Sequence, residues 1–168
     1  MNWLIAAMVA VFAIAYWNTD KYDSRKDLTE LSHYYQQHQT EFRQLAQAAC
    51  AYRARNPGTY LTFEVDFPAS YPAEIQPEVD TLKRVLRKLG KTELALPVAP
   101  QGGCSLFLLQ WSEWRGAGGS HLGFSYQPAQ HTEYKPELHD ATEQDLTQPL
   151  FYSKTLGDGW VLEYVNIP

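Results

Sequence analysis

The 168-residue sequence predicts an α+β fold: an N-terminal transmembrane helix, then one domain with two helices packed on a mainly antiparallel sheet. The chain begins with an uninterrupted apolar run and continues with a helical pattern. Its C-terminal half contains short alternating segments between turn signals. Helices followed by a run of strands are typical of a sheet covered by helices on one face. We therefore divide the chain into an anchor (1–19), a polar tether (20–26) and a single α+β domain (27–168).

The apolar run extends from Trp3 to Trp17, and no charged side chain precedes Asp20. At about 1.5 Å per residue, the uncharged residues 1–19 reach about 28 Å, close to the thickness of a hydrocarbon core. Tryptophans at both ends of the run are typical of an interfacial aromatic belt. The sequence therefore predicts an uncleaved membrane anchor.

Two other interpretations of this segment remain open. Ala13 to Ala15 fits the cleavage site of a secretory signal, although no basic residue precedes the apolar run. A buried core helix is the third interpretation, but such a helix is rarely apolar on all sides in a domain of this size. We keep the anchor as the leading prediction.

The orientation of the domain is predicted by two opposing signals. Lys21, Arg25 and Lys26 follow the span, which favours a cytoplasmic-facing domain by the positive-inside rule. Two cysteines, and the resemblance of the start to a bacterial export-type N-terminus, favour export. We predict a single-pass protein of the inner membrane with its domain in the periplasm, and keep the cytoplasmic orientation as the alternative.

Cys50 and Cys104 are the only cysteines, and their spacing fits neither a redox pair nor a zinc site. In an oxidising compartment they predict one disulfide; two buried thiols are the alternative. The formal charge of −5 and the lack of a basic run disfavour nucleic acid as a partner. Membrane contact is expected through residues 1–19 alone, and no cofactor is expected.

A helix is predicted from Leu28 to Tyr52, where apolar residues recur every three or four positions. Asp27 occupies the N-cap position, and Asn56-Pro57-Gly58 ends the pattern. The apolar seam could face a partner helix in a coiled coil or the domain's own sheet. Its tyrosine, histidine and alanine residues favour the sheet. The seam comprises Leu28, Leu31, Tyr35, His38, Phe42, Leu45, Ala49 and Tyr52.

The next two elements are a strand and a second helix. Tyr60–Phe67 alternates strictly between apolar and polar residues, which predicts a strand with one buried face. Pro77 is suited to the first position of a helix, and Gly90 ends it. The apolar face of that helix comprises Val79, Leu82, Val85, Leu86 and Leu89.

The remaining elements are strands. Leu94–Val98 predicts a short edge strand, and Cys104–Trp114 a central strand covered on both faces. A glycine-rich loop then joins Cys104–Trp114 to His121–Gln127 as a hairpin, and that loop lacks the ending of a phosphate-binding loop. Leu150–Thr155 and Trp160–Val165 flank a strong turn signal and predict a second hairpin.

The polar segment Pro128–Pro149 contains candidate metal ligands. A helical turn over Glu137–Leu146 would place His139 and Glu143 on one face, and His131 could complete a site for a divalent metal. A solvated acidic loop is the more ordinary interpretation of such a segment.

Other candidates come from the strands. The sequence contains no nucleophile-elbow motif, and Glu113 and Glu163 would form a glycosidase pair only if the fold brought them together. Trp111 and Trp114 are expected on opposite faces of their strand, and tryptophan is favoured as an interface anchor. The predicted binding residues are Trp111, Trp114, Glu137, Asp140 and Glu143.

Two classes of function follow. The leading hypothesis is a membrane-anchored, envelope-facing, non-enzymatic protein-binding domain of accessory, inhibitor or immunity type, with a basic partner if the acidic loop takes part. The alternative is an envelope hydrolase, either metal-dependent through His131 and His139 or carboxylate-based. A hydrolase needs a concave pocket with converging titratable groups, whereas a binding module needs a flat or convex aromatic patch.

Overall fold

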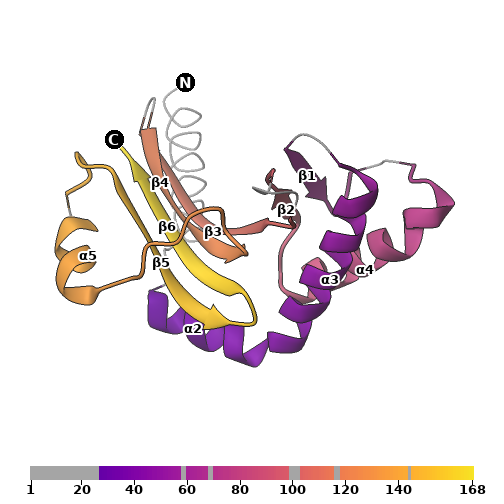
Figure 1. Ribbon diagram of the computed structural model, residues 1–168, viewed down its shortest axis with the longest axis horizontal. Helices are drawn as coiled ribbons and strands as arrows, with labels where there is room; N and C mark the ends of the chain where they lie inside the picture. Colours follow the sequence, from indigo (N-terminus) through magenta and orange to yellow (C-terminus); the bar gives the residue numbers. More distant parts are fainter. Residues whose placement is uncertain (1–26, 58–59, 68–69, 99–102, 116–117, 144) are drawn as a thin grey trace, which may run out of the picture.

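The computed structural model describes residues 27–57, 60–67, 70–98, 103–115, 118–143 and 145–168. The predicted anchor (1–19) and tether (20–26) lie outside these ranges. Within them, no helix has both the length and the apolar character needed to cross a membrane. The described part has an α+β fold in which helices pack with a six-stranded antiparallel sheet (Figure 1).

The sheet has the strand order β1-β2-β3-β4-β6-β5, and every neighbouring pair is antiparallel. Both predicted hairpins, β3–β4 and β5–β6, are confirmed. The second turn is tight because Gly157, Asp158 and Gly159 all have positive φ angles. The strands are β1 (Leu61–Glu64), β2 (Glu93–Leu96), β3 (Leu106–Arg115), β4 (Gly118–Tyr126), β5 (Leu150–Gly157) and β6 (Trp160–Ile167).

Two predicted strands differ from the structure. The strand expected over Tyr60–Phe67 is reduced to β1, and Phe67 is exposed. The strand expected at the sheet edge, Leu94–Val98, corresponds to β2, which lies between β1 and β3. The edge position belongs to β1 because β2 pairs with β1 over four residues and with β3 through Ala95 and Phe107.

The first predicted helix is two helices, α2 (Leu28–Gln37) and α3 (Gln39–Arg55). The backbone of His38, at φ −118° and ψ 21°, interrupts them, although no proline or glycine marks the break. The Asp27 side chain accepts a hydrogen bond from the backbone N–H of Glu30 at 2.6 Å, which confirms the predicted N-cap. The break lets α2 lie below the β5–β6 hairpin while α3 runs beside α4 (Figure 1).

The core lies between these helices and one face of the sheet. The predicted seam packs within its own domain, as expected, and α4 (Gln76–Lys88) adds its predicted apolar face. Gly90 ends α4 with φ 63°, and the backbone N–H of Lys91 bonds the carbonyl oxygen of Leu86 at 2.8 Å. A single helical turn (Ala73–Ile75) precedes α4, and α5 (Pro136–Glu143) lies at the β5 edge.

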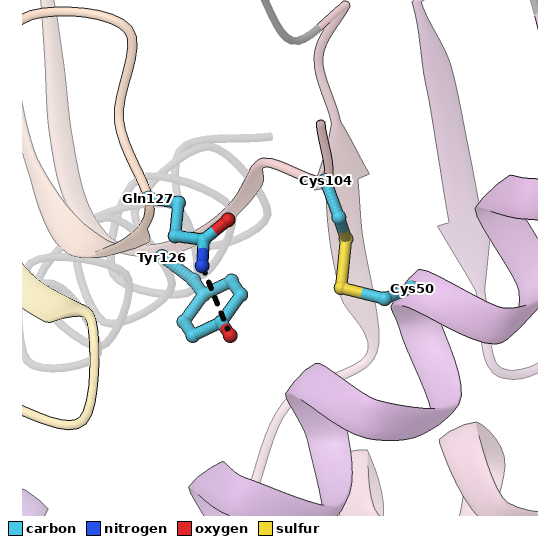
Figure 2. Close-up of a disulfide and its surroundings, with 4 residues drawn as sticks. All are labelled: Cys50, Cys104, Tyr126 and Gln127. Atoms are coloured by element: carbon cyan, nitrogen blue, oxygen red, sulfur yellow. Dashed lines mark hydrogen bonds between the residues drawn. A yellow bond between two sulfur atoms is a disulfide. The ribbon is translucent and has the colours of Figure 1, made fainter. Parts of the chain in front are cut away.

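The predicted disulfide is present. Cys50 lies in α3 and Cys104 comes two residues before β3, with their Cα atoms 5.4 Å apart. Figure 2 shows the bond joining the helix to the chain segment that leads into the sheet. The bridge therefore ties the helical layer to the centre of the sheet.

Candidate functional site

The two faces of the sheet have different surroundings. On one face, Phe124 and Trp160 contact Phe42 of α3, with ring centroids 4.7 and 5.0 Å from that ring. Side chains of a strand alternate between faces, so the intervening residues point away from these helices. We call this second side the open face. Its residues include Phe107, Leu109, His121, Gly123, Ser125, Phe151 and Glu163.

The strand register aligns side chains across the open face. Leu109 of β3, Gly123 of β4 and Glu163 of β6 form one cross-strand row. A Cβ atom at Gly123 would lie 2.6 Å from the ring of Phe107, so only glycine lets this ring lie across β4. The same ring meets His121 edge-on, with centroids 5.4 Å apart. Phe107 therefore forms a wall between the centre of β4 and the solvent.

Two adjoining hollows occupy the open face. The first has a volume of about 320 Å³ and the second about 380 Å³, and both are lined by Tyr60 and Phe107. We call them together the open-face groove. Three apolar side chains along it are unusually accessible: Tyr60 is 61% exposed, Val98 59% and Leu109 45%. The first hollow is also lined by Pro97, Ser105, His121, Ser125, Pro128, Ala129, Gln130, Phe151 and Glu163.

Two half-buried titratable groups lie in the first hollow. Burial raises the pKa of the Glu163 carboxyl above its ordinary value, although a hydrogen bond with Ser125 opposes this effect. Burial lowers the pKa of the His121 imidazole. Among the described residues that line this hollow there is no lysine or arginine. Glu163 is therefore the one acidic residue among the described residues that line this hollow, and it lies beside apolar and neutral polar side chains.

The predicted acidic surface is only partly available for contacts. Glu137 is exposed on α5, whereas Asp140 accepts a hydrogen bond from the Tyr134 hydroxyl at 2.5 Å. Burial and this bond raise the pKa of Tyr134 to about 12. Glu143 accepts a hydrogen bond from the Tyr152 hydroxyl at 2.7 Å. Asp140 therefore stabilises the polar segment internally, and Glu143 holds the segment against β5.

The structure does not bring the two candidate metal-binding histidines together. His131 Nδ1 lies 2.7 Å from the hydroxyl of Ser153, whereas the ring of His139 stacks on Tyr152 at 5.0 Å. Tyr152 and Ser153 are consecutive in β5 and point to opposite faces. The described residues contain no group of three histidine, cysteine or acidic side chains that could hold a metal ion.

His139 and Glu143 share one face of α5, as the spacing predicts, but that face meets Tyr152 rather than solvent. His139 is 4% exposed, and its Nδ1 accepts a hydrogen bond from the backbone N–H of Lys135 at 2.9 Å. Its ring and the Glu143 carboxylate both contact Tyr152. The i, i+4 pair therefore attaches α5 to the sheet.

Of the two tryptophans predicted as interface anchors, the structure describes the surroundings of Trp111. Trp111 is opposite Leu122, so it lies on the helix-facing side and packs against the core. A β-bulge between Leu109 and Trp111 places these two residues on opposite faces despite their spacing of two. Trp114 is opposite Gly119, and its side chain lies outside the described part of the structure.

The two carboxylates considered as a glycosidase pair lie on opposite faces. Glu113 is opposite Ser120 of β4, and Glu163 is opposite Gly123, three residues further along the same strand. Residues separated by an odd number of positions on a regular strand point to opposite faces of the sheet. Glu113 and Glu163 therefore cannot flank one substrate.

The groove itself was not predicted from the sequence, although a local signal for it exists. Between Gly119 and Ser125, small or polar residues alternate with the buried Leu122 and Phe124. Such alternation indicates a strand face that no helix fills. The alignment of Glu163 with Gly123 depends on the β4–β6 pairing, which joins residues about 40 positions apart and has no local signature.

The chain matches no protein-family model, and the comparisons with curated proteins and with solved structures found no match either. Function is therefore inferred from the chain's own geometry. The open-face groove is the best-supported candidate site because it combines concavity, exposed apolar side chains and two half-buried titratable groups.

Proposed function

We propose that this chain is a membrane-anchored, envelope-facing, non-enzymatic protein-binding domain of accessory, inhibitor or immunity type. Residues 1–19 hold it in the inner membrane, the domain lies in the periplasm, and the open-face groove receives a basic protein partner. The observation that carries the proposal is the set of exposed apolar side chains along the groove: Tyr60, Val98 and Leu109.

Exposed apolar residues that gather around a concave surface mark an interaction site more often than isolated ones do. Full burial of one valine or leucine side chain is worth about 1.5–3 kcal/mol. Val98 and Leu109 are both about half exposed, so a partner that covered them would gain a substantial part of this energy. The aromatic ring of Tyr60, which lines both hollows, provides a further anchor.

A basic partner follows from charge complementarity. The chain carries a formal charge of −5, and the described residues of the first hollow include Glu163 but no lysine or arginine. The second hollow is lined by one residue of each charge, Lys91 and Glu93. Opposite net charges accelerate association and make it sensitive to salt. Glu137 on α5 adds to this long-range attraction, whereas Asp140 and Glu143 are engaged with tyrosine hydroxyls.

The hydrolase alternative has weaker support. The Ser153 hydroxyl is hydrogen-bonded to His131, as a nucleophile and base would be, but Ser153 is fully buried and does not line either hollow. The groove is concave, as a hydrolase site must be, but the titratable residues that line its first hollow are Tyr60, His121 and Glu163, and Glu113 lies on the other face of the sheet. Among the described residues no cluster of three histidine, cysteine or acidic side chains could hold a metal ion. Binding is therefore the function that the groove supports best.

Substitution of an exposed leucine tests the binding surface. Full-length tagged protein purified from its native membranes is expected to retain a stoichiometric basic partner. Leu109→Asp should reduce its recovery at least about tenfold, because a carboxylate buried in an apolar contact costs more than about 1.4 kcal/mol. Leu138→Asp is the matched control, since Leu138 is 56% exposed but lies on α5.

Both variants should melt within a few degrees of the wild type, since exposed positions contribute little to stability. Loss of the partner with Leu138→Asp and its retention with Leu109→Asp would move the contact to the acidic segment and contradict the proposal. Equal recovery in all three proteins would also contradict it.

The anchor is tested by extraction. The full-length protein is expected to remain in the membrane fraction after alkaline carbonate treatment, because an apolar helix of about 28 Å spans the hydrocarbon core. A variant lacking residues 1–17 should be soluble. Release of the intact chain by carbonate would overturn the membrane-anchored part of the proposal.

A further inference from the structure

We infer that the hollow beside Glu163 binds a lysine or arginine side chain presented by the partner. This inference rests on the proposed function and specifies the chemistry of its contact. The hollow, here called the Glu163 pocket, is the first of the two in the open-face groove, and its volume is about 320 Å³. That volume is at the lower end of the range for ligand pockets, which suits one side chain better than a cofactor.

The walls of the Glu163 pocket fit an aliphatic stem. Phe107 and Phe151 come from β3 and β5 on either side, and Tyr60, Pro97 and Val98 complete an apolar lining. The position of Phe107 is fixed by the close approach of its ring to Gly123. Lysine and arginine pack their methylene groups along such surfaces and place the charged head beyond them. The two phenylalanine rings can also attract the cation directly.

The carboxylate of Glu163 is the group that such a head would reach. Within the described residues Glu163 has no ion pair, and its carboxylate is hydrogen-bonded with the Ser125 hydroxyl. A carboxylate has about four acceptor positions, so one hydroxyl leaves most of them available. Gly123 pairs with Glu163 in the same cross-strand row, and the ring of Phe107 lies over Gly123 as one wall of the pocket. The pocket beside that ring therefore offers a charged donor both space and an acceptor.

Burial makes an added cation more favourable at this position than at the surface. A half-buried carboxylate has lost part of its hydration, and in the lower dielectric around it a hydrogen-bonded opposite charge interacts more strongly than at the surface. The surface pairs of this chain differ in this respect. Arg43 and Asp158, for example, form an ion pair at 3.1 Å while both side chains are more than half exposed.

The pocket also predicts the pH dependence of cation binding. The titratable residues that line the pocket with Glu163 are His121 of β4 and Tyr60. On the β5 side, Ser153 pairs with Glu163, and its hydroxyl contacts His131. Glu163 must be deprotonated to attract a cation, and a protonated His121 would repel one. Burial raises the pKa of Glu163 and lowers that of His121. Acidification therefore weakens cation binding through both groups.

Small side-chain analogues test this inference on the full chain in detergent micelles. Nα-acetyl-lysine methylamide and Nα-acetyl-arginine methylamide are titrated while NMR signals of His121 and of the pocket methyl groups are followed. Both are expected to bind with dissociation constants on the order of 1 mM, as one side chain can provide. The uncharged norleucine analogue should bind at least about tenfold more weakly. Equal binding of norleucine and lysine would overturn the inference.

Glu163→Gln keeps the shape of the side chain and removes its charge. The variant should bind the lysine analogue at least about tenfold more weakly and leave norleucine binding unchanged. Undiminished lysine binding would contradict the inference, since the carboxylate would then not be the receptor.

The stability of Glu163→Gln separates binding from folding. The folded-state pKa of Glu163 lies above its unfolded value, so its stabilising contribution is present at low pH and is lost as pH rises through the folded pKa. At pH 8 the variant should therefore melt no lower than the wild type. A lower melting temperature at pH 8 would assign Glu163 to the fold and reject the inference.

The outcomes distinguish this inference from the proposed function. If Leu109→Asp abolishes partner recovery while the cationic analogues do not bind, the groove is a binding surface without a cation pocket. If the analogues bind through Glu163 while Leu109→Asp retains the partner, the pocket is correct and the proposed protein contact is wrong.

Discussion

Replacement of Cys50 and Cys104 by alanine is expected to lower the free energy of unfolding by about 4 kcal/mol. The two cysteines are 54 residues apart in sequence, and in the chain-entropy model a loop of this length restricts the unfolded state by that amount. For a domain of this size, the melting temperature should fall on the order of 10 °C. Thermal melting of the variant under oxidising conditions measures the effect.

The reduced wild type provides the matched control. Without the bond, the reduced wild type should have the same melting temperature as the double variant. Each single cysteine-to-alanine variant should also have that melting temperature. A reductant should leave the double variant unchanged. If the reduced wild type melts as high as the oxidised protein, the bridge does not restrict the unfolded chain and the expected effect is wrong.

Phe42→Ala is expected to cost about 3–5 kcal/mol, the range found when a buried phenylalanine is truncated to alanine. Phe42 is fully buried in α3, and its ring contacts those of Tyr35, Phe124 and Trp160 with centroids 4.7–5.0 Å away. These contacts join the helical layer to both β4 and β6. The loss would therefore leave a cavity between the helices and the sheet. Urea unfolding monitored by circular dichroism measures the change.

Two variants control this measurement. Phe42→Leu should cost less than the alanine change because it removes fewer buried atoms. Tyr60→Ala also removes an aromatic ring, but that ring is 61% exposed on the open face, so its effect should stay near 0.5 kcal/mol or less. Equal losses for Phe42→Ala and Tyr60→Ala would show that the aromatic contacts of α3 do not stabilise the domain as described.

Local sequence signals predicted the elements with tight turns and clear caps. The β5–β6 hairpin was predicted from Gly157, Asp158 and Gly159, whose positive φ angles few other residues tolerate. The end of α4 was predicted from Gly90 for the same reason. The interruption at His38 was not predicted, because the three-and-four spacing of apolar residues continues through it. On either side of the break the helices have different partners: α2 contacts β6, whereas α3 packs on α4.

The candidate site was less predictable because it depends on the faces of strands. Leu109 and Trp111 alternate as one face in sequence, yet the bulge between them turns Leu109 to the open face and Trp111 to the core. His139 is a plausible metal ligand in a polar loop, but its ring stacks on Tyr152. Glu163 was considered as a partner of Glu113, and only the β4 register shows that they lie on opposite faces. Each outcome depends on pairing between distant segments.

The most direct measurement of the proposed function is photo-crosslinking from the open face. A photoreactive amino acid at position 109 of the full-length chain, irradiated in native membranes, should crosslink to a single basic protein at high yield. The same amino acid at position 138, on α5, should crosslink to it weakly or not at all, because Leu138 is exposed away from the groove. A crosslinked partner at position 138 with none at position 109 would contradict the open face as the binding surface.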